Sequence, residues 1–215
     1  MAERGRPRCF DREQALRRAM TIFWKHGYEG SSLACLTDAM QINSPSLYST
    51  FGSKEALFKE ALDLYDREAG SPVAEILQNT PSAREAIASL LRASARCFCE
   101  PDRPAGCMVL LSALNCTPAN AGVWQHLHER RLRSDALLRA RLVRGVADGD
   151  IPATVDVQML ATFYIGVRQG MSMQALDGAG HDVLLGMAGA AMAAWDVLVS
   201  GAPPQPVATP ASGTG

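Results

Sequence analysis

A short polar segment near the N-terminus carries residue types that can contact the bases of a DNA duplex. Its small residues would let the backbone lie close to a groove, and they are Ser44, Pro45, Ser46 and Thr50. Leu47 and Phe51, four residues apart, would hold the inner face of the segment against a core. Tyr48 and Lys54 flank it with a phenol and an ammonium group, both suited to phosphate oxygens. These residue types predict recognition of a duplex.

Four helices are expected to position this segment, because apolar residues recur there at helical spacing. The first helix follows the cap Asp11 and ends at Gly27, and the caps of the next three are Ser31 or Ser32, Asn43 or Ser44, and Ser53. The third helix is barely two turns long, and the fourth continues to about Ala69. Two short helices separated by Gln41, Ile42 and Asn43 form a helix-turn-helix arrangement. The second of them is expected to enter the major groove, while Ser32 and Thr37 contact phosphates.

Residues 1–10 are expected to form a flexible basic arm. Residues 1–27 contain seven basic and three acidic residues, although the whole chain is nearly neutral, with 21 Lys and Arg and 22 Asp and Glu. Basic N-terminal arms commonly contact nucleic acid. Arg4 and Arg6 could enter an A·T-rich minor groove. The alternative is a solvated arm that touches phosphates without sequence specificity.

A dense set of motif residues lies across residues 11–62. They are Phe23, Gly27, Tyr28, Ser32, Leu33, Leu36, Thr37, Ile42, Ser46, Leu47 and Tyr48, followed by the run Phe51–Leu57. This pattern resembles the TetR/AcrR family of bacterial transcriptional regulators. The resemblance implies a homodimeric repressor that a small-molecule effector releases from its operator. By motif position it implies that Thr37, Ser44, Ser46, Tyr48 and Lys54 contact the DNA.

One residue departs from the family pattern, which usually has glycine at the turn where this chain has Gln41. A left-handed conformation there would cost a non-glycine residue roughly 1 kcal/mol.

The alternative interpretation of residues 11–66 is a small helical bundle that binds no DNA. The arm and the polar third helix favour DNA binding, and the complete set of expected contacts is Arg4, Arg6, Ser32, Thr37, Asn43, Ser44, Pro45, Ser46, Tyr48 and Lys54.

Residues 67–200 are expected to form a second helical domain that binds a ligand and pairs two chains. Its longer helices are expected over residues 82–99, 106–116, 120–146, 154–176 and 181–199, which makes the chain all-α with about nine helices. The last helix carries a stripe of small residues beside larger apolar ones, and the predicted dimer contacts are Gly186, Ala190, Ala194, Met187 and Trp195. The alternative is a core helix within one chain. Residues 201–215 contain four prolines and no charge, so a disordered tail is expected.

A pocket for a small, partly hydrophobic effector would be lined by apolar residues and by a few polar residues that orient the ligand. The candidates are Cys107, Met108, Leu111, Trp124, Phe163, Arg168, Gln169, Met171 and Met173, and the alternative for each is ordinary core. Arg168 stands among apolar residues and needs a partner. That partner could be Asp156, an acid of the other chain, or an anionic ligand.

Other function classes are less well supported by the sequence. A thiol or metal sensor is conceivable because the chain has six cysteines, but Cys97 and Cys99 would point apart on a helix, as would Cys107 and Cys116. No phosphate loop, nucleophile elbow or paired histidines indicate an enzyme, and neither a cofactor nor a metal is expected. The thirteen uncharged residues 183–195 are too few for a membrane span. With no signal peptide, we expect a cytoplasmic protein.

Overall fold

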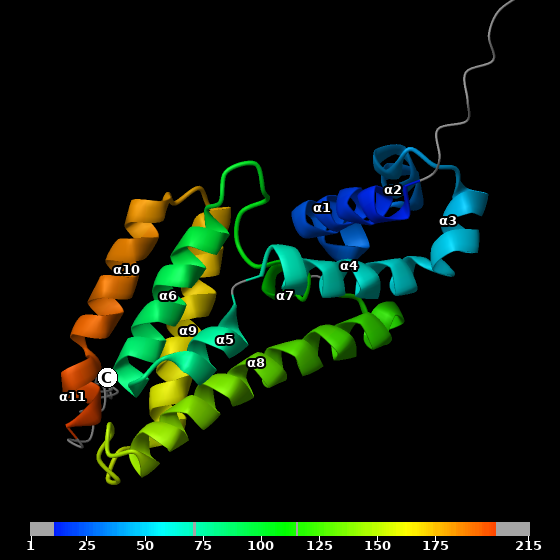
Figure 1. Cartoon of the computed structure of the whole chain (residues 1–215). Coiled ribbons are helices and arrows are strands. Elements are labelled where there is room, and N and C mark those ends of the chain that lie inside the picture. Colours follow the sequence, from blue (N-terminus) through cyan, green and yellow to red (C-terminus); the bar gives the residue numbers. More distant parts are fainter. Residues whose placement is uncertain (1–10, 71, 115, 201–215) are drawn as a thin grey trace, which may run out of the picture.

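The computed structural model describes residues 11–70, 72–114 and 116–200, and within them it contains helices and no strand (Figure 1). This confirms the all-α class. The basic arm with Arg4 and Arg6, and the tail at 201–215, lie outside the described residues. The N-terminal helices are α1 (Arg12–Gly30), α2 (Leu33–Met40), α3 (Ser44–Phe51) and α4 (Lys54–Glu68).

Local sequence decides where these four helices begin. The caps are Asp11, Ser32, Asn43 and Ser53, and in each case the side-chain oxygen accepts a hydrogen bond from a first-turn amide. Such amides have no partner inside the helix, so a cap oxygen satisfies a group that would otherwise be unpaired. Gly27 does not end α1 as expected. Its φ of 67° kinks the helix, and a last turn continues to Gly30.

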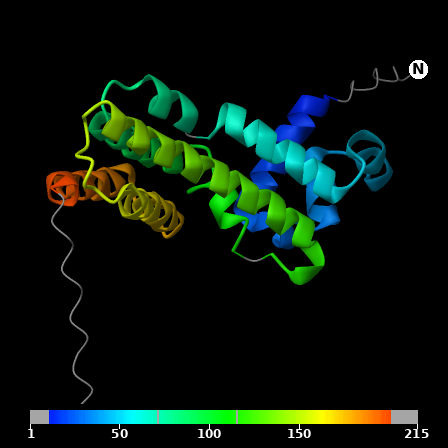
Figure 2. The same ribbon diagram turned by 90° about the horizontal axis from the view of Figure 1, so that it is seen from below.

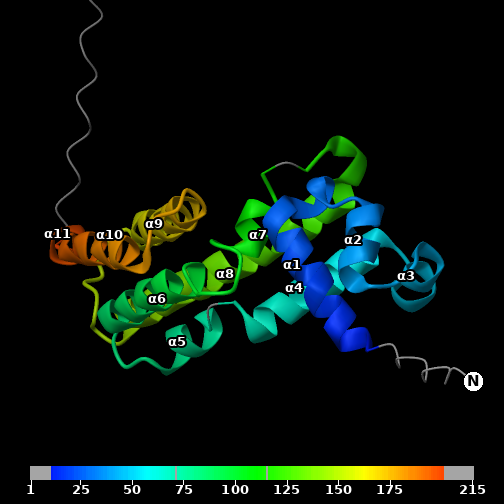
Figure 3. The same ribbon diagram turned by 90° about the horizontal axis from the view of Figure 1, so that it is seen from above.

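The remaining elements are α5 (Val73–Asn79), α6 (Ala83–Phe98), α7 (Met108–Leu111), the 3-10 helix η1 (Pro118–Asn120), α8 (Ala121–Ala147), α9 (Val157–Leu176), α10 (His181–Ala193) and α11 (Trp195–Val199). The 27-residue helix α8 runs along both halves of the molecule (Figures 1 and 2). One end lies by η1 and α7, and the rest packs against α5, α6 and α9. Figure 3 shows α6, α9 and α10 side by side at the end opposite α3.

Four boundaries in this half differ from the sequence expectation. The short helix α5 was not anticipated, and α9 begins at Val157 because the carboxylate of Asp156, not Thr154, caps it. The helix expected over 181–199 is divided into α10 and α11 at Ala194. The helix expected over 106–116 is reduced to the four residues of α7.

A close contact with α9 explains why α7 begins late. Gly106 has a φ of +76°, and a Cβ atom on it would lie 2.8 Å from the carbonyl oxygen of Ser172. The amide of Cys107 donates a hydrogen bond of 2.8 Å to Ser172 Oγ. Because these contacts hold the backbone outside the helical region, the helix begins only at Met108.

Two hydrophobic cores stabilise the chain. The first lies among α1–α4, around Phe23, Leu47 and Phe58, and it also receives Met108 from α7 and Leu127 from α8. The second is formed by α5, α6 and α8–α11 and contains the largest buried aromatic side chains of that half. Residues of α7 and α8 therefore contribute to the core that supports the helix-turn-helix.

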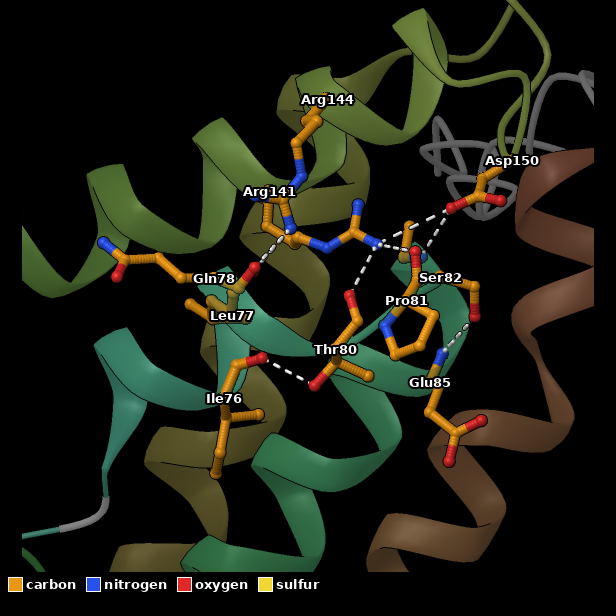
Figure 4. A network of polar contacts seen from close by, with 11 residues as sticks. Ile76, Leu77, Gln78, Thr80, Pro81, Ser82, Glu85, Arg141, Arg144 and Asp150 are labelled. Atoms are coloured by element: carbon orange, nitrogen blue, oxygen red, sulfur yellow. Dashed lines mark hydrogen bonds and ion pairs between the residues drawn. The ribbon is translucent and has the colours of Figure 1, made fainter.

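Two arginines of α8 fix the end of α5 (Figure 4). Arg141 is 2% exposed, and its Nη2 donates to the carbonyl of Pro81 at 3.1 Å and lies 3.6 Å from Asp150 Oδ2. Arg144 Nη2 donates to the carbonyl of Leu77 at 2.9 Å. One carbonyl lies in the last turn of α5 and the other just after it, so neither has a hydrogen-bond partner within the helix. The two guanidinium groups donate to them instead and hold α5 against α8.

Candidate nucleic-acid interface and ligand cavity

Helix α3 presents a polar outer surface and is held by two apolar residues. Leu47 and Phe51 are 0% and 4% exposed and belong to the first core. Ser44, Pro45 and Tyr48 point outward, and Tyr48 is 47% exposed. Figure 3 shows α3 at one end of the molecule with no later helix covering it. An exposed short helix of small residues matches the geometry of a recognition helix.

The caps of α2 and α3 retain groups that can donate to phosphate oxygens. Ser32 Oγ accepts a hydrogen bond from the amide of Cys35 at 3.1 Å, and no described residue accepts its hydroxyl proton. Asn43 Oδ1 accepts from the amide of Ser46 at 2.8 Å, and its NH₂ group has no acceptor among the same residues. Because phosphate oxygens are acceptors, both side chains can serve a DNA backbone without losing the cap.

Two other expected contacts are already engaged within the protein. The hydroxyl of Thr37 donates to the carbonyls of Leu33 and Ala34, at 2.9 and 3.1 Å, so its single proton is used inside α2. Lys54 Nζ lies 4.3 Å from the centre of the Tyr28 ring. Burial lowers the pKa of Lys54. Thr37 and Lys54 remain predicted DNA contacts. To bind a phosphate, each would have to leave its present partner within the protein.

The turn between α2 and α3 contains the strain expected from the sequence. Gln41 has φ 58° and ψ 42°, a left-handed conformation that favours glycine. The turn nevertheless closes, since the amides of Gln41 and Ile42 donate to the carbonyls of Asp38 and Thr37, each at 3.0 Å. The helix-turn-helix is therefore formed at a small energetic cost.

A cavity of about 520 Å³ lies at the boundary between the two halves. Its walls come from the end of α4, the start of α5, α6, α7, the middle of α8, and α9. Tyr65 and Asp66 of α4 line it, so the helix that follows α3 also reaches the cavity. A volume of this size is within the range of small-molecule sites.

The cavity brings together three of the expected sensing residues, Cys107, Arg168 and Gln169. Met108 and Met171 are 0% exposed and lie in the two cores, and Leu111 is not on the wall. Trp124 stacks on His128 on the outside of α8. Phe163 and Met173 lie on the outer surface of α9, each 36% exposed. The sensing roles of these six residues stay predictions.

Sequence reasoning missed most of the charged wall of the cavity. Arg130, Arg131 and Asp135 of α8 line it, together with Tyr65 and Asp66. The arginines and acids of α8 were interpreted as a solvated surface. A signal was present, because Arg131, Asp135 and Leu138 follow one another at spacings of four and three and share a helix face.

An exposed apolar surface, here called the α9/α10 face, covers the outer side of those helices. Along α9 it runs from Phe163 past Gly166 and Gly170 to Met173, and along α10 it includes Val183, Gly186 and Ala190. An added Cβ on Gly166, Gly170 or Gly186 would meet no atom within 4 Å. A partner helix could therefore approach closely.

The five predicted dimer residues occupy different positions. Gly186 and Ala190 lie on the α9/α10 face. Met187 is half-buried against the second core, and Ala194 lies at the break between α10 and α11. Trp195 is 3% exposed, with its ring 5.7 Å from that of Tyr164 in the same chain.

The cysteines do not assemble into a sensor in the part of the chain that the structure describes. Burial raises the pKa of the Cys97, Cys99 and Cys116 thiols, which reduces the reactive thiolate fraction. The Cys99 thiol is also engaged, 3.3 Å from the carbonyl of Ala179. No group of three His, Cys, Asp or Glu residues within these described ranges is arranged to hold a metal ion. The thiol or metal alternative gains no support.

A helix-turn-helix with an exposed second helix, joined to a helical half with a cavity and an apolar face, defines a ligand-responsive transcriptional regulator. Comparisons with known proteins agree with this class. Residues 15–61 match the family model of bacterial regulatory proteins, tetR family, and residues 81–180 match that of the tetracyclin repressor-like C-terminal domain.

Individual relatives extend over almost the whole chain. The HTH-type transcriptional repressor ComR of Escherichia coli is 39% identical over 197 residues, which cover 91% of this chain and 94% of that protein. A solved structure of a cysteine variant of the TetR family regulator CifR, in complex with 26-bp operator DNA, is 48% identical, with a TM-score of 0.83. The match covers 89% of this chain and all of that one. A TetR regulator structure from Rhodococcus is 35% identical, covers 88% and 99% of the two chains, and has a TM-score of 0.56.

The chain belongs to the TetR family and is a transcriptional repressor of that family. The fold, the resemblance stated from residues 11–62 and the regulatory function are confirmed together.

Proposed function

We propose that this repressor binds a pseudo-palindromic operator as a homodimer and is released from it by a small-molecule effector in the cavity. The observation that carries the proposal is helix α3, whose outer residues are exposed while Leu47 and Phe51 are buried. Each protomer would place α3 in a major groove, with the two helices roughly 34–36 Å apart or a multiple of that. We propose no catalytic step for this chain, and we propose that it works in the cytoplasm, as regulators of this family generally do.

The DNA contacts are proposed in two groups. Ser44, Pro45, Ser46 and Tyr48 would face the bases and the nearest phosphates, because they form the outer surface of α3. Ser32, Asn43, Thr37 and Lys54 would bind phosphates and so fix the orientation of the helix without reading sequence. The arm residues Arg4 and Arg6 would add contacts beyond this surface.

The α9/α10 face is proposed as the dimer interface. Its glycines and Ala190 allow close helix approach, and its larger members, such as Val183 at 54% exposure, would otherwise leave apolar surface in water. By length and composition alone, the segment His181–Val199 could also cross a membrane. The inner residues Leu184, Ala188 and Ala191 pack on α6 and α9, which favours a protein partner for the outer side.

The effector would act through α4, since this helix connects the cavity to the helix-turn-helix. Arg130 of α8 is ion-paired with both Asp63 and Asp66 of α4, and Asp66 also lines the cavity. A ligand between α4 and α8 would favour one arrangement of these helices over another. Because α4 follows α3 directly, that preference would change the separation of the two α3 helices in the dimer.

The test is a titration of duplexes from the chromosomal neighbourhood of the gene with the purified full chain, followed by fluorescence anisotropy with excess competitor DNA. The proposal expects saturable binding of one duplex by two chains, with affinity that falls steeply as salt rises. Binding that is equal for the neighbouring duplexes and for random DNA would contradict it. Tyr48→Ala serves as the matched negative variant.

A further inference from the structure

We propose that the cavity binds an organic anion, a carboxylate or sulfonate on a compact apolar body, and that Arg168 and Arg131 hold the anionic group. The inference rests on the proposed function, because it names the chemical class of the effector. It is carried by two guanidinium groups on the cavity wall that have unused N–H donors.

Arg168 of α9 is anchored on one side only. Its Nε donates a hydrogen bond of 3.0 Å to Ser94 Oγ, and its guanidinium carbon lies 5.9 Å from the centre of the Phe98 ring. Asp156, the partner considered from the sequence, instead caps the start of α9 by accepting from the amide of Met159. Within the described ranges, no ion pair or hydrogen bond engages the two Nη groups of Arg168. These groups can therefore grip a carboxylate in the bidentate manner of arginine.

Arg131 of α8 supplies the second donor. Its Nη1 is buried and has no hydrogen-bond partner among the described residues. A buried N–H on a cation that lacks an acceptor costs free energy, and an anionic ligand would supply the acceptor when the guanidinium group turns toward the cavity. Arg131 and Arg168 lie on contacting helices on the wall of the same cavity, and both act on the carboxyl group of Asp135, so the proposed anionic group lies between α8 and α9 beside this residue.

The charge balance of the wall favours an anion over a cation. Five arginines and three acidic residues line the cavity. Arg130 is already neutralised by Asp63 and Asp66. Asp135 is half-buried near Arg131 and Arg168, and burial raises its pKa in spite of both arginines. A cationic ligand would meet the remaining arginines, whereas an anion would relieve their mutual repulsion.

The rest of the wall requires an apolar body on the ligand. Leu90, Phe98, Leu138 and Ile165 line the cavity from three helices, and its volume of about 520 Å³ can hold a molecule with up to three aromatic rings. An inorganic anion alone would leave this apolar surface uncovered. The chemistry of the site therefore points to a ligand that is anionic at one end.

Two dyes with the same aromatic body distinguish the contribution of the anionic group from that of the apolar body. Anilinonaphthalene sulfonate carries the anionic group, and phenylnaphthylamine lacks it. Fluorescence titration of the full chain without DNA should show one saturable site per chain for the sulfonate dye. Its affinity should exceed that of the neutral dye at least about tenfold, as expected for charge-assisted hydrogen bonds.

The variant Arg168→Met should weaken the sulfonate dye about tenfold or more and leave the neutral dye unchanged. Arg131→Met should act in the same direction and provides a second test if Arg168→Met fails to fold. Arg96→Met is the matched control, because Arg96 is an exposed residue of α6 outside the cavity wall. No saturable site, equal affinities of the two dyes, or sulfonate binding that both cavity variants leave unchanged would overturn the proposal.

The same preparations are also titrated with operator duplex. Anion-selective dye binding without any operator binding would contradict the proposed function but support the anion site. Operator binding without anion selectivity would remove the ligand class alone.

Discussion

Glu29 at the end of α1 accepts a hydrogen bond of 2.8 Å from Asn120 Nδ2 at the start of α8. The same Oε1 also accepts from the amide and the hydroxyl of Thr117, at 2.9 and 2.8 Å. One carboxylate thus ties the helix-turn-helix half to the helix that runs under the ligand cavity.

These three donors lower the pKa of Glu29, with the amide of Thr117 contributing most. A carboxyl group whose folded pKa is depressed stabilises the fold above its unfolded pKa, and that contribution is lost as pH falls through the folded value. We therefore expect Glu29→Gln to lower Tm at neutral pH, with the difference from wild type shrinking below about pH 4. Thermal unfolding at several pH values measures this, with Glu100→Gln in the exposed loop after α6 as control. A difference that stays constant down to low pH would contradict the assignment.

The strained turn predicts a stabilising substitution. Gln41 is left-handed, so Gln41→Gly should raise the free energy of unfolding by up to about 0.5 kcal/mol, which is the strain of roughly 1 kcal/mol less the greater freedom of unfolded glycine. Ala39→Gly, in the right-handed last turn of α2, should instead cost about 0.5–1 kcal/mol. Urea unfolding of both variants gives the two values. A destabilised Gln41→Gly would show that the side chain has a role that the turn geometry does not include.

The dimer interface predicts a sharp effect of charge. Ala190→Glu would bury a carboxylate in the α9/α10 face, so it should yield monomers that no longer bind the operator. Ala136→Glu, at an exposed position of α8, should leave both properties unchanged. Sedimentation velocity distinguishes the two results. An Ala190→Glu variant that still forms dimers would place the interface elsewhere.

The recognition helix predicts a loss of affinity without a loss of stability. Tyr48 is 47% exposed, so Tyr48→Ala should weaken operator binding at least about tenfold, through lost base and phosphate contacts, while Tm changes little. Val143 is 56% exposed in the part of α8 that packs against α5, next to Arg144, and Val143→Ala should leave operator affinity unchanged. Anisotropy titrations compare the variants. Equal affinities of wild type and Tyr48→Ala would take this side chain out of the interface.

The sequence predicted best what depends on a few neighbouring residues. Asp11, Ser32, Asn43 and Ser53 cap the helices that their side chains indicated, because a cap needs only an oxygen close to the first-turn amides. The strain at Gln41 was predictable for the same reason.

Contacts between distant segments could not be predicted in this way. The positive φ of Gly106 accompanies its close contact with Ser172, which lies 66 positions later in the chain and on another helix. The charged wall of the cavity likewise arises only where α4, α8 and α9 meet, and the face that Arg131 and Asp135 share with Leu138 was its one local sign. Trp195, chosen for an interface, fills a gap beside Tyr164 that no local pattern indicates.

The central claim is that two α3 helices bind two half-sites on the same side of one duplex. The most direct measurement compares the operator with a version that has about five base pairs, half a helical turn, inserted between its half-sites. The insertion turns one half-site to the opposite side, so affinity should fall at least about a hundredfold, and an insertion of about ten base pairs should not rotate it. Undiminished binding to the half-turn insertion, at the same stoichiometry of two chains per duplex, would contradict the account.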